Sequence, residues 1–177
     1  MLILLTGGSA CGKSSFAESL CQKLPAPRVY LAAMKPYGEA GRDKIEKHRR
    51  MRAGKGFRTI ERYSDYVNLF LPSCQTVLLE CICNLTANEM FDECGREKDP
   101  VEAGLRGIEN LRAQCADLIV VTNEIGSDME AYSESTKRYI AAIGKINRAL
   151  AQKADAVYEL VCGIPVLLKG KALEVAI

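Results

Sequence analysis

The feature that most constrains this chain is a glycine-rich segment, residues 7–14, which reads GGSACGKS and matches G-x-x-x-x-G-K-[S/T] at every position. An apolar run at residues 2–5 precedes it, and a helix-compatible stretch at residues 14–23 follows it. In a strand, glycine-rich loop and helix that follow one another in this order, the backbone N–H groups of the loop and the N-terminus of the helix surround a phosphate. The segment therefore predicts a nucleoside triphosphate site. Its predicted binding residues are Gly7, Gly8, Ser9, Ala10, Cys11, Gly12, Lys13 and Ser14.

Polar side chains in and beyond this loop are the predicted catalytic and metal-binding groups. Lys13 supplies a cation for the β- and γ-phosphates, and the Ser14 hydroxyl is placed to bind Mg²⁺. Glu80 ends a buried apolar run, so it can orient Mg²⁺, directly or through water, or accept hydrogen bonds from a nucleoside. Asn123 and Glu124 follow a second such run. For these last three residues, a strand-end side chain that only faces solvent is the alternative.

Short apolar runs alternate with helical stretches along the chain. Runs that are apolar at consecutive positions indicate strands buried on both faces, and hence a parallel sheet covered by helices. We therefore predict an α/β fold, a single domain over residues 1–177 with a mostly parallel, doubly wound sheet and ligand groups at the carboxyl ends of its strands. The expected strands are 2–6, 28–33, 76–81, 117–122, 156–162 and 164–169, and the expected helices are 14–23, 40–52, 61–71, 99–115 and 133–153.

Composition argues against several classes of protein. The 177 residues carry a net charge of +2, which is too small to indicate a nucleic-acid or membrane partner. No apolar run approaches the roughly 18 residues that cross a bilayer, and the apolar start is too short for a signal peptide. We therefore expect a cytoplasmic protein whose eight cysteines are reduced and are mostly small core residues.

A basic segment, residues 42–58, surrounds the only histidine, His48, with eight lysines and arginines against two acidic residues. Lys44 and Arg52 lie one helical turn either side of His48, and nearby cations disfavour the imidazolium. A neutral imidazole among cations suits a nucleophile that forms a phosphoramidate at a nucleotide phosphorus. We therefore predict that His48 is a catalytic nucleophile. A bystander histidine on a solvated helix face is the alternative.

With the phosphate loop, the histidine helix and Glu80, the chain resembles the bifunctional adenosylcobinamide kinase/adenosylcobinamide-phosphate guanylyltransferase family of cobalamin biosynthesis. Many families share a phosphate loop. A histidine–arginine helix followed by Arg-Thr-x-Glu and later by Val-Thr-Asn-Glu-x-Gly is far more restrictive. The resemblance covers nearly the whole chain and rests on residues 4–14, 30–32, 45–52, 58–61, 78–81, 121–126, 145–148 and 163–165.

The resemblance implies a RecA-like P-loop fold and two reactions. Family members phosphorylate the aminopropanol hydroxyl of adenosylcobinamide with GTP or ATP and Mg²⁺. They then transfer GMP from GTP, through a guanylylated histidine, to give adenosylcobinamide-GDP. The guanylylated residue corresponds to His48, and a homotrimer is expected. Beyond the loop, the implied nucleotide contacts are Ala32, Ala33, Met34, Arg49, Arg50, Met51, Arg52, Glu61 and Glu80.

Two other kinds of function remain open from the sequence. The same residues are compatible with a single-activity small-molecule kinase or guanylyltransferase. They are also compatible with a nucleotide-binding switch module that turns over no metabolite. His48 discriminates between these possibilities, because only guanylyl transfer through the protein needs a nucleophile at that position.

Overall fold

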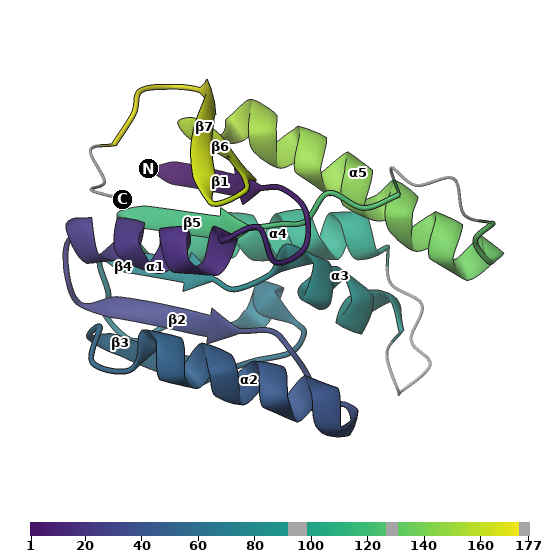
Figure 1. Cartoon of the computed structure of the whole chain (residues 1–177), viewed down its shortest axis with the longest axis horizontal. Helices are drawn as coiled ribbons and strands as arrows, with labels where there is room; N and C mark the ends of the chain where they lie inside the picture. Colours follow the sequence, from purple (N-terminus) through teal and green to yellow (C-terminus); the bar gives the residue numbers. More distant parts are fainter. Residues whose placement is uncertain (92–98, 127–130, 174–177) are drawn as a thin grey trace.

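The strands form one sheet with the order β3-β2-β4-β5-β1-β6-β7 (Figure 1). The computed structural model describes residues 1–91, 99–126 and 131–173. Neighbouring strands are parallel except β6 and β7, which run antiparallel at one edge. The predicted α/β fold with a mostly parallel sheet is therefore confirmed. The strands are β1 (Leu2–Thr6), β2 (Arg28–Ala32), β3 (Phe57–Glu61), β4 (Thr76–Leu79), β5 (Asp117–Val121), β6 (Ala156–Val161) and β7 (Ile164–Lys169).

Helices cover both faces of the sheet. On one face α1 packs against β1, β4 and β5, and on the other α4 and α5 contact β5 and β1, with α3 packed against both helices. Figure 1 shows α2 running alongside β2 and β3, at the edge of the sheet opposite to β7. The helices are α1 (Lys13–Lys23), α2 (Gly38–Arg52), α3 (Ile82–Met90), α4 (Pro100–Ala113) and α5 (Glu134–Lys153), with a 3-10 helix η1 (Tyr66–Asn68).

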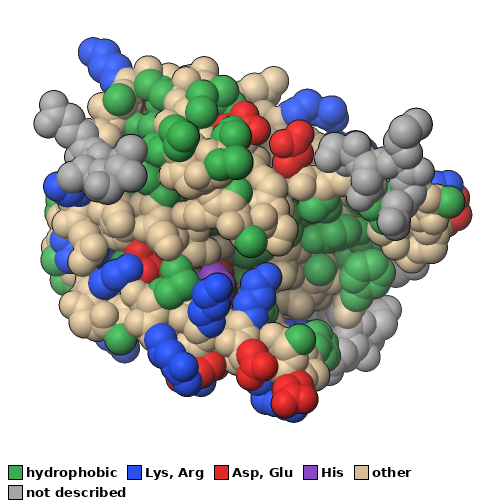
Figure 2. Space-filling view, in the orientation of Figure 1, with side chains coloured by type: hydrophobic (Ala, Val, Ile, Leu, Met, Phe, Trp, Pro, Cys, Tyr) green, Lys and Arg blue, Asp and Glu red, His purple; other side chains and the backbone are tan. Residues whose placement is uncertain are grey.

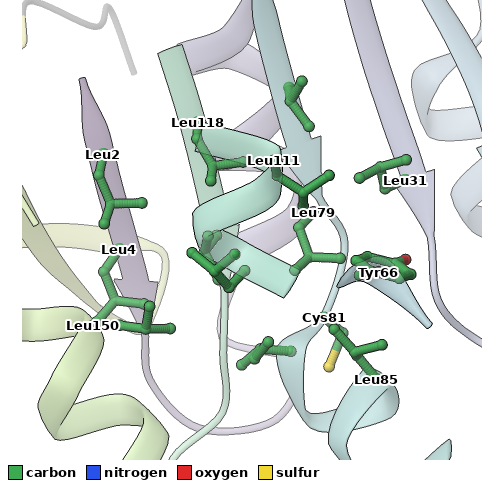
Figure 3. Close-up of a cluster of buried hydrophobic side chains, with 14 of the residues drawn as sticks. Leu2, Leu4, Leu31, Tyr66, Leu79, Cys81, Leu85, Leu111, Leu118 and Leu150 are labelled. Carbon is green, nitrogen blue, oxygen red and sulfur yellow. The ribbon is translucent and has the colours of Figure 1, made fainter. Parts of the chain in front are cut away.

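The central strands are buried on both faces because successive side chains point to opposite sides of a sheet. In β1, Leu2 and Leu4 belong to the cluster beneath α3, α4 and α5, whereas Ile3 and Leu5 belong to the cluster beneath α1. Figure 3 shows the first of these clusters, where Leu150 of α5 lies beside the strand side chains. Fully burying one such leucine or isoleucine contributes about 1.5–3 kcal/mol to the free energy of folding. The two clusters therefore hold the central strands between the helices on both faces.

The carboxyl ends of the parallel strands meet at one edge of the sheet. The phosphate loop follows β1, residues 33 and 34 follow β2, Glu80 directly follows β4, and Asn123 lies just beyond β5. Tyr30 of β2 is in register with Leu78 of β4, so Glu80 leaves its strand on the same face as Tyr30. That face is the one covered by α1. The fold thus brings the predicted ligand groups of four strands to one place.

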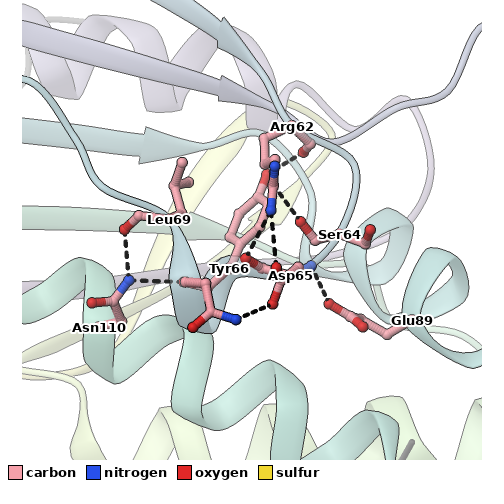
Figure 4. Close-up of polar contacts among 8 residues, drawn as sticks. Arg62, Ser64, Asp65, Tyr66, Leu69, Glu89 and Asn110 are labelled. Carbon is pink, nitrogen blue, oxygen red and sulfur yellow. Dashed lines mark hydrogen bonds and ion pairs between the residues drawn. The ribbon is translucent and has the colours of Figure 1, made fainter.

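The predicted helix over residues 61–71 is wrong. The segment holds only the three-residue η1, and Asp65 before it has a left-handed φ of 59°, which interrupts helical geometry. Side chains from other elements satisfy its backbone (Figure 4): Asn110 donates to the carbonyl of Tyr66, and Glu89 accepts from the N–H of Asp65. These bonds join residues far apart in sequence, so the local pattern does not show them.

One strand and one helix are not predicted from the sequence. β3 carries no apolar run, because most of its side chains are exposed at the sheet edge. α3 is a short helix that begins two residues after Glu80. The other helices and strands begin and end within two residues of their predicted bounds.

Within the described ranges, none of the helices combines the length and the apolar character that a membrane span requires. The seven cysteines in these ranges carry free thiols. Cys162 is exposed, and Cys94 lies outside the described residues. Four cysteines are buried, as expected for small core residues: Cys21, Cys74, Cys81 and Cys83.

Candidate active site

The phosphate loop begins where β1 ends and runs into the N-terminus of α1. Gly7 and Gly12 have φ angles of 133° and 96°, a region that residues with a Cβ rarely adopt. A Cβ at Gly7 would also lie 2.6 Å from the carbonyl oxygen of Leu160, so no larger residue fits without a shift of the backbone. Gly12 precedes Lys13, the first residue of α1, so the positive end of this helix faces the loop.

The side chain of Lys13 is buried and folds back into the loop. Its Nζ donates to the carbonyl oxygen of Gly7 at 2.9 Å and to that of Gly8, and it lies 3.5 Å from Sγ of Cys11. The ammonium is thus held inside the loop. Its charge and the inward N–H groups of a glycine-rich loop both attract phosphate.

The loop lines a cavity of about 350 Å³, which we call the phosphate-loop cavity. Segments at the ends of the other strands also line it, through Met34 after β2, Glu80 after β4 and Asn123 after β5. The helix α2 lines a further side. The predicted loop residues that line this cavity are Ser9, Ala10, Cys11, Gly12, Lys13 and Ser14.

The basic helix α2 brings His48 to the phosphate-loop cavity. Lys44, Lys47 and His48 line it together, because residues three and four apart share one face of a helix. Figure 2 shows the only histidine, in purple, next to cationic side chains. The side chain of His48 is only 12% exposed. The predicted nucleophile, two lysines and the phosphate loop therefore surround one cavity.

The imidazole of His48 is held in its neutral form. Burial lowers the pKa of His48 below its ordinary value of 6.5, because the charged ring would lose hydration. The positive charges of Lys44, Arg52 and Lys47 lower this pKa further. The direction agrees with the expectation from sequence, whereas the largest cause, burial, becomes apparent only in the fold.

Glu80 and Tyr30 both approach the same nitrogen of His48. Nδ1 lies 3.4 Å from Oε1 of Glu80 and 3.4 Å from the hydroxyl oxygen of Tyr30. Burial raises the pKa of the Glu80 carboxyl. The backbone N–H of Met34, the hydroxyl of Tyr30 and the charge of Arg52 oppose this rise. Oε2 of Glu80 is buried without a hydrogen-bond partner among the described residues, which leaves it to accept from a ligand or a bound water.

Ser14 and Glu80 fit a magnesium ion that binds together with a triphosphate. Mg²⁺ in such sites takes one or two protein oxygens and fills its octahedron with phosphate oxygens and water. Ser14 and Glu80 line the phosphate-loop cavity, and Oε2 of Glu80 is buried without a hydrogen-bond partner among the described residues. The described residues hold no cluster of three or more His, Cys, Asp or Glu side chains suited to a metal ion.

A second cavity of about 350 Å³ shares Met34, His48 and Glu80 with the first, and we call it the α2–β3 cavity. Residues of α2 and the ends of β2 and β3 line it. A ligand that occupied both cavities would therefore contact the imidazole. The other predicted nucleotide contacts that line it are Ala32, Arg49, Arg52 and Glu61.

Two arginines of α2 are engaged within the chain. Arg52 is buried, its guanidinium lies 4.4 Å from the centre of the Tyr30 ring, and its Nε donates to Oγ1 of Thr59 at 3.0 Å. Arg49 forms an ion pair with Glu61 at 2.6 Å, with both side chains about half exposed. Arg52 therefore supports the wall of the site, and Arg49 and Glu61 form its outer rim.

The remaining predicted residues divide between the cavities and the rest of the molecule. Met51 lines the phosphate-loop cavity. Ala33 is fully buried and Arg50 pairs with Glu46 at 3.1 Å, and neither lines either cavity. Glu124 lies three residues beyond β5 and is exposed, as the alternative from the sequence allowed.

Tyr30 and Asn84 are among the residues of the site that were missed from the sequence. Tyr30 stands in an apolar strand, where it counts as core, although its hydroxyl reaches His48. The alternation along β2, which puts Tyr30 on the α1 face, is the signal that would have found it. Asn84 lines the phosphate-loop cavity from α3, a helix that was not predicted.

The chain is similar to known proteins over nearly its whole length. Residues 3–168 match the model of a family described as cobinamide kinase / cobinamide phosphate guanyltransferase. The chain is 32% identical to the bifunctional adenosylcobalamin biosynthesis protein CobU of Escherichia coli (strain K12), covering 96% of this chain and 100% of that protein. It is 31% identical, with the same coverage, to CobU of Salmonella typhimurium. It is 28% identical to CobP of Pseudomonas aeruginosa, covering 96% of this chain and 98% of that protein.

A solved structure of a DnaB-like replicative helicase with its interactions with primase is also similar. The TM-score is 0.45 and the identity 10%, and the match covers 89% of this chain and 46% of that one.

Proposed function

The chain belongs to the cobinamide kinase / cobinamide phosphate guanyltransferase family, and we propose that it acts in two steps on adenosylcobinamide. It first phosphorylates the aminopropanol hydroxyl of this substrate with a nucleoside triphosphate. It then transfers GMP from GTP to the new phosphate and gives adenosylcobinamide-GDP. Its relatives from Escherichia coli and Salmonella typhimurium are named bifunctional adenosylcobalamin biosynthesis proteins.

One observation supports this proposal most directly: the phosphate loop and His48 line a single cavity. A kinase alone needs the loop and its lysine but no nucleophile beside it. A neutral, largely buried imidazole next to a phosphate site is what transfer through a phosphoramidate requires.

In the proposed kinase step, the loop N–H groups and Lys13 hold the β- and γ-phosphates and offset the charge that moves to the leaving group. The substrate hydroxyl attacks the γ-phosphorus and loses its proton to a phosphate oxygen or to water, and the bond to the bridging oxygen of the β-phosphate breaks. We propose that the hydroxyl of Ser14 and the carboxylate of Glu80 would hold Mg²⁺. The ion, when bound, neutralises charge on the β- and γ-phosphate oxygens.

In the proposed guanylyl transfer, His48 attacks the α-phosphorus of GTP and pyrophosphate leaves. A phosphate oxygen of adenosylcobinamide phosphate then attacks the same phosphorus, and the N–P bond breaks. Lys44 and Lys47 line the cavity beside His48 and can offset negative charge in both steps. The route through His48 thus replaces one direct transfer between two anionic substrates by two successive attacks on the α-phosphorus at a preformed site.

We propose GTP for the guanylyl step and GTP or ATP for the kinase step. The phosphates would occupy the phosphate-loop cavity and the nucleoside the α2–β3 cavity, where Arg49 and Glu61 offer hydrogen-bond donors and acceptors. His48 and Glu80 line both cavities, so in this pose the α-phosphorus would lie beside the imidazole.

Labelling with α-³²P GTP and Mg²⁺ tests the proposal. Wild type should retain label that is stable to alkali and lost in acid, as a phosphoramidate is, whereas His48→Ala should retain none. Lys13→Ala should slow labelling on the order of 100-fold, while Lys23→Ala, at the other end of α1, should not. His48→Ala should still phosphorylate adenosylcobinamide from γ-³²P nucleotide. Absence of label from wild type would contradict the guanylyl intermediate and leave a kinase or a switch.

We also propose that the protein is a cytoplasmic homotrimer. The reduced thiols of the described cysteines fit a reducing compartment. The edge strand β7 exposes Ile164, Val166 and Leu168, which gives the chain an apolar surface suited to contact with further copies.

A further inference from the structure

The two ring nitrogens of His48 stand in different surroundings. Nδ1 faces Oε1 of Glu80 and the hydroxyl oxygen of Tyr30, each at 3.4 Å. The side chains of His48 and Glu80 are only 12% and 5% exposed, so water competes little for these contacts. Which nitrogen carries the proton is set by the partners of the other one.

Both partners of Nδ1 present lone pairs to it. The hydroxyl of Tyr30 is hydrogen-bonded to Glu80, and an ionised carboxylate only accepts, so Tyr30 donates its proton to the carboxylate. Burial raises the pKa of the Glu80 carboxyl above its ordinary value, and the backbone N–H of Met34, the hydroxyl of Tyr30 and the charge of Arg52 oppose this rise by favouring the carboxylate. Nδ1 therefore meets two acceptors and satisfies them only by carrying a hydrogen.

The hydroxyl of Tyr30 is held by the packing of its ring. Tyr30 is 2% exposed, and its ring makes an edge contact with Phe57 at 5.9 Å between centroids. The guanidinium of Arg52 lies over the Tyr30 ring, and its Nε donates a hydrogen bond to Oγ1 of Thr59. The register of β2 and β4 fixes the position of Tyr30 relative to Glu80. The two acceptors are thus parts of the rigid sheet edge.

We propose that Tyr30 and Glu80 are positioning residues that hold His48 as the Nδ1–H tautomer and so present Nε2 as the nucleophile. This inference rests on the proposed guanylyl transfer. It gives Glu80 a role through Oε1 that is separate from its unpartnered Oε2.

The bonds balance without any proton leaving the ring. The lone pair of Nε2 forms the N–P bond, and the α-phosphorus–oxygen bond breaks with its electron pair going to pyrophosphate. The ring keeps its Nδ1 hydrogen and becomes a cation, whose charge Glu80 offsets. When the phosphate acceptor attacks, the N–P electron pair returns to Nε2. A ring that lost the Nδ1 proton would have to leave as an imidazolate anion, which is a poorer leaving group than neutral imidazole.

Because His48 is the only histidine, ¹⁵N-histidine labelling gives one pair of ring nitrogen signals and reports the tautomer without any substrate. Above the pKa of the ring, wild type should show a protonated, pyrrole-type Nδ1 and an unprotonated Nε2. In Glu80→Gln, whose amide can donate or accept, the tautomers should mix. Single-turnover labelling with α-³²P GTP should slow on the order of 100-fold or more, with little change in the GTP concentration for half-saturation.

Tyr30→Phe keeps the ring and should slow labelling roughly tenfold with a smaller tautomer shift. Tyr158→Phe is the matched control, since Tyr158 is another buried tyrosine with an edge contact to a phenylalanine, Phe16, at 5.5 Å. It should change neither tautomer nor rate. An Nε2–H tautomer in labelled wild type, or an unchanged tautomer in Glu80→Gln, would overturn the inference and leave the guanylyl intermediate standing. Wild type that takes no label would overturn both.

Discussion

The chemistry proposed for His48 depends on a ring that is uncharged near neutral pH. Its pKa is lowered first by burial and then by Lys44, Arg52 and Lys47, so the ring should titrate below about 6.5. The unfolded chain binds this proton more readily, so acidification through that range also destabilises the fold. Guanylylation should therefore be constant above the lowered pKa and fall as pH drops through it, as the imidazolium has no lone pair.

An NMR titration of the single histidine measures this pKa directly. Lys44→Gln removes a cation one turn away and should raise the midpoint, while Lys23→Gln, at the far end of α1, should not move it. A wild-type midpoint at or above 6.5 would contradict the proposed neutral nucleophile.

The sequence motifs identified side chains that lie within one continuous segment and line the phosphate-loop cavity, such as Lys13, Ser14 and His48. They did not identify partners that the sheet brings together. Arg52 was expected to contact nucleotide, but it also stacks on Tyr30 and bonds to Thr59. Those contacts depend on β3 lying beside β2, and β3 has no apolar run to reveal it.

Among the helices and strands, the contact of α4 with η1 depends on a glycine. A Cβ at Gly107 would lie 2.8 Å from Cβ of Tyr66. Asn110 of the same helix donates a hydrogen bond to the backbone carbonyl of Tyr66. Gly107→Ala should therefore lower the free energy of unfolding by about 1–3 kcal/mol. Gly144→Ala in α5, where nothing lies within 4 Å, should raise it by roughly 0.5–1 kcal/mol. Urea unfolding of both variants measures this, and equal signs would contradict the packing described here.

An ion pair joins α1 to the turn between α2 and β3. Nζ of Lys55 lies 2.6 Å from Oε2 of Glu18, whose side chain is fully buried. Removing one partner of a buried pair leaves a charge without compensation, so Lys55→Met should destabilise by about 3 kcal/mol. Combining it with Glu18→Gln should restore much of this loss, because no carboxylate then remains buried.

The exposed pair of Lys137 with Glu134 is the control for that cycle. Lys137→Met should change the free energy of unfolding by less than about 1 kcal/mol. Urea denaturation of the single and double variants provides the measurement. Equal losses at Lys55 and Lys137 would mean that the Glu18 pair does not join these elements.

For the chain as a unit, the sequence predicted the mostly parallel sheet and the edge where ligand groups meet, because consecutive apolar positions indicate buried parallel strands. It failed for residues 61–71, whose backbone is satisfied by Asn110 and Glu89 rather than by helical bonds. That segment connects the strand carrying Glu61 to the one that delivers Glu80. Long-range hydrogen bonds determine the path of this segment. The single domain over residues 1–177 stays a prediction.

The hairpin of β6 and β7 connects the proposed assembly surface with the phosphate loop. The N–H of Gly163, in its turn, donates to the carbonyl of Cys11 at 3.0 Å. On its outer strand Ile164 and Leu168 are 62% and 58% exposed, and Figure 2 shows hydrophobic side chains gathered over this region. An apolar edge strand left uncovered invites further association, so a closed assembly that covers it would stabilise both the strand and the loop beneath it.

If copies of the chain meet through this surface, the double substitution Ile164→Glu and Leu168→Glu should convert a trimer into monomers. The two new carboxylates would be buried in the interface without partners, which is costly. Light scattering after size exclusion should give three times the chain mass of 19.4 kDa for wild type and the single mass for the double variant. Phe70→Glu is the control, because Phe70 is 87% exposed but lies on the segment between β3 and β4. A monomeric wild type, or dissociation by Phe70→Glu alone, would show that the β7 surface is not what joins the subunits.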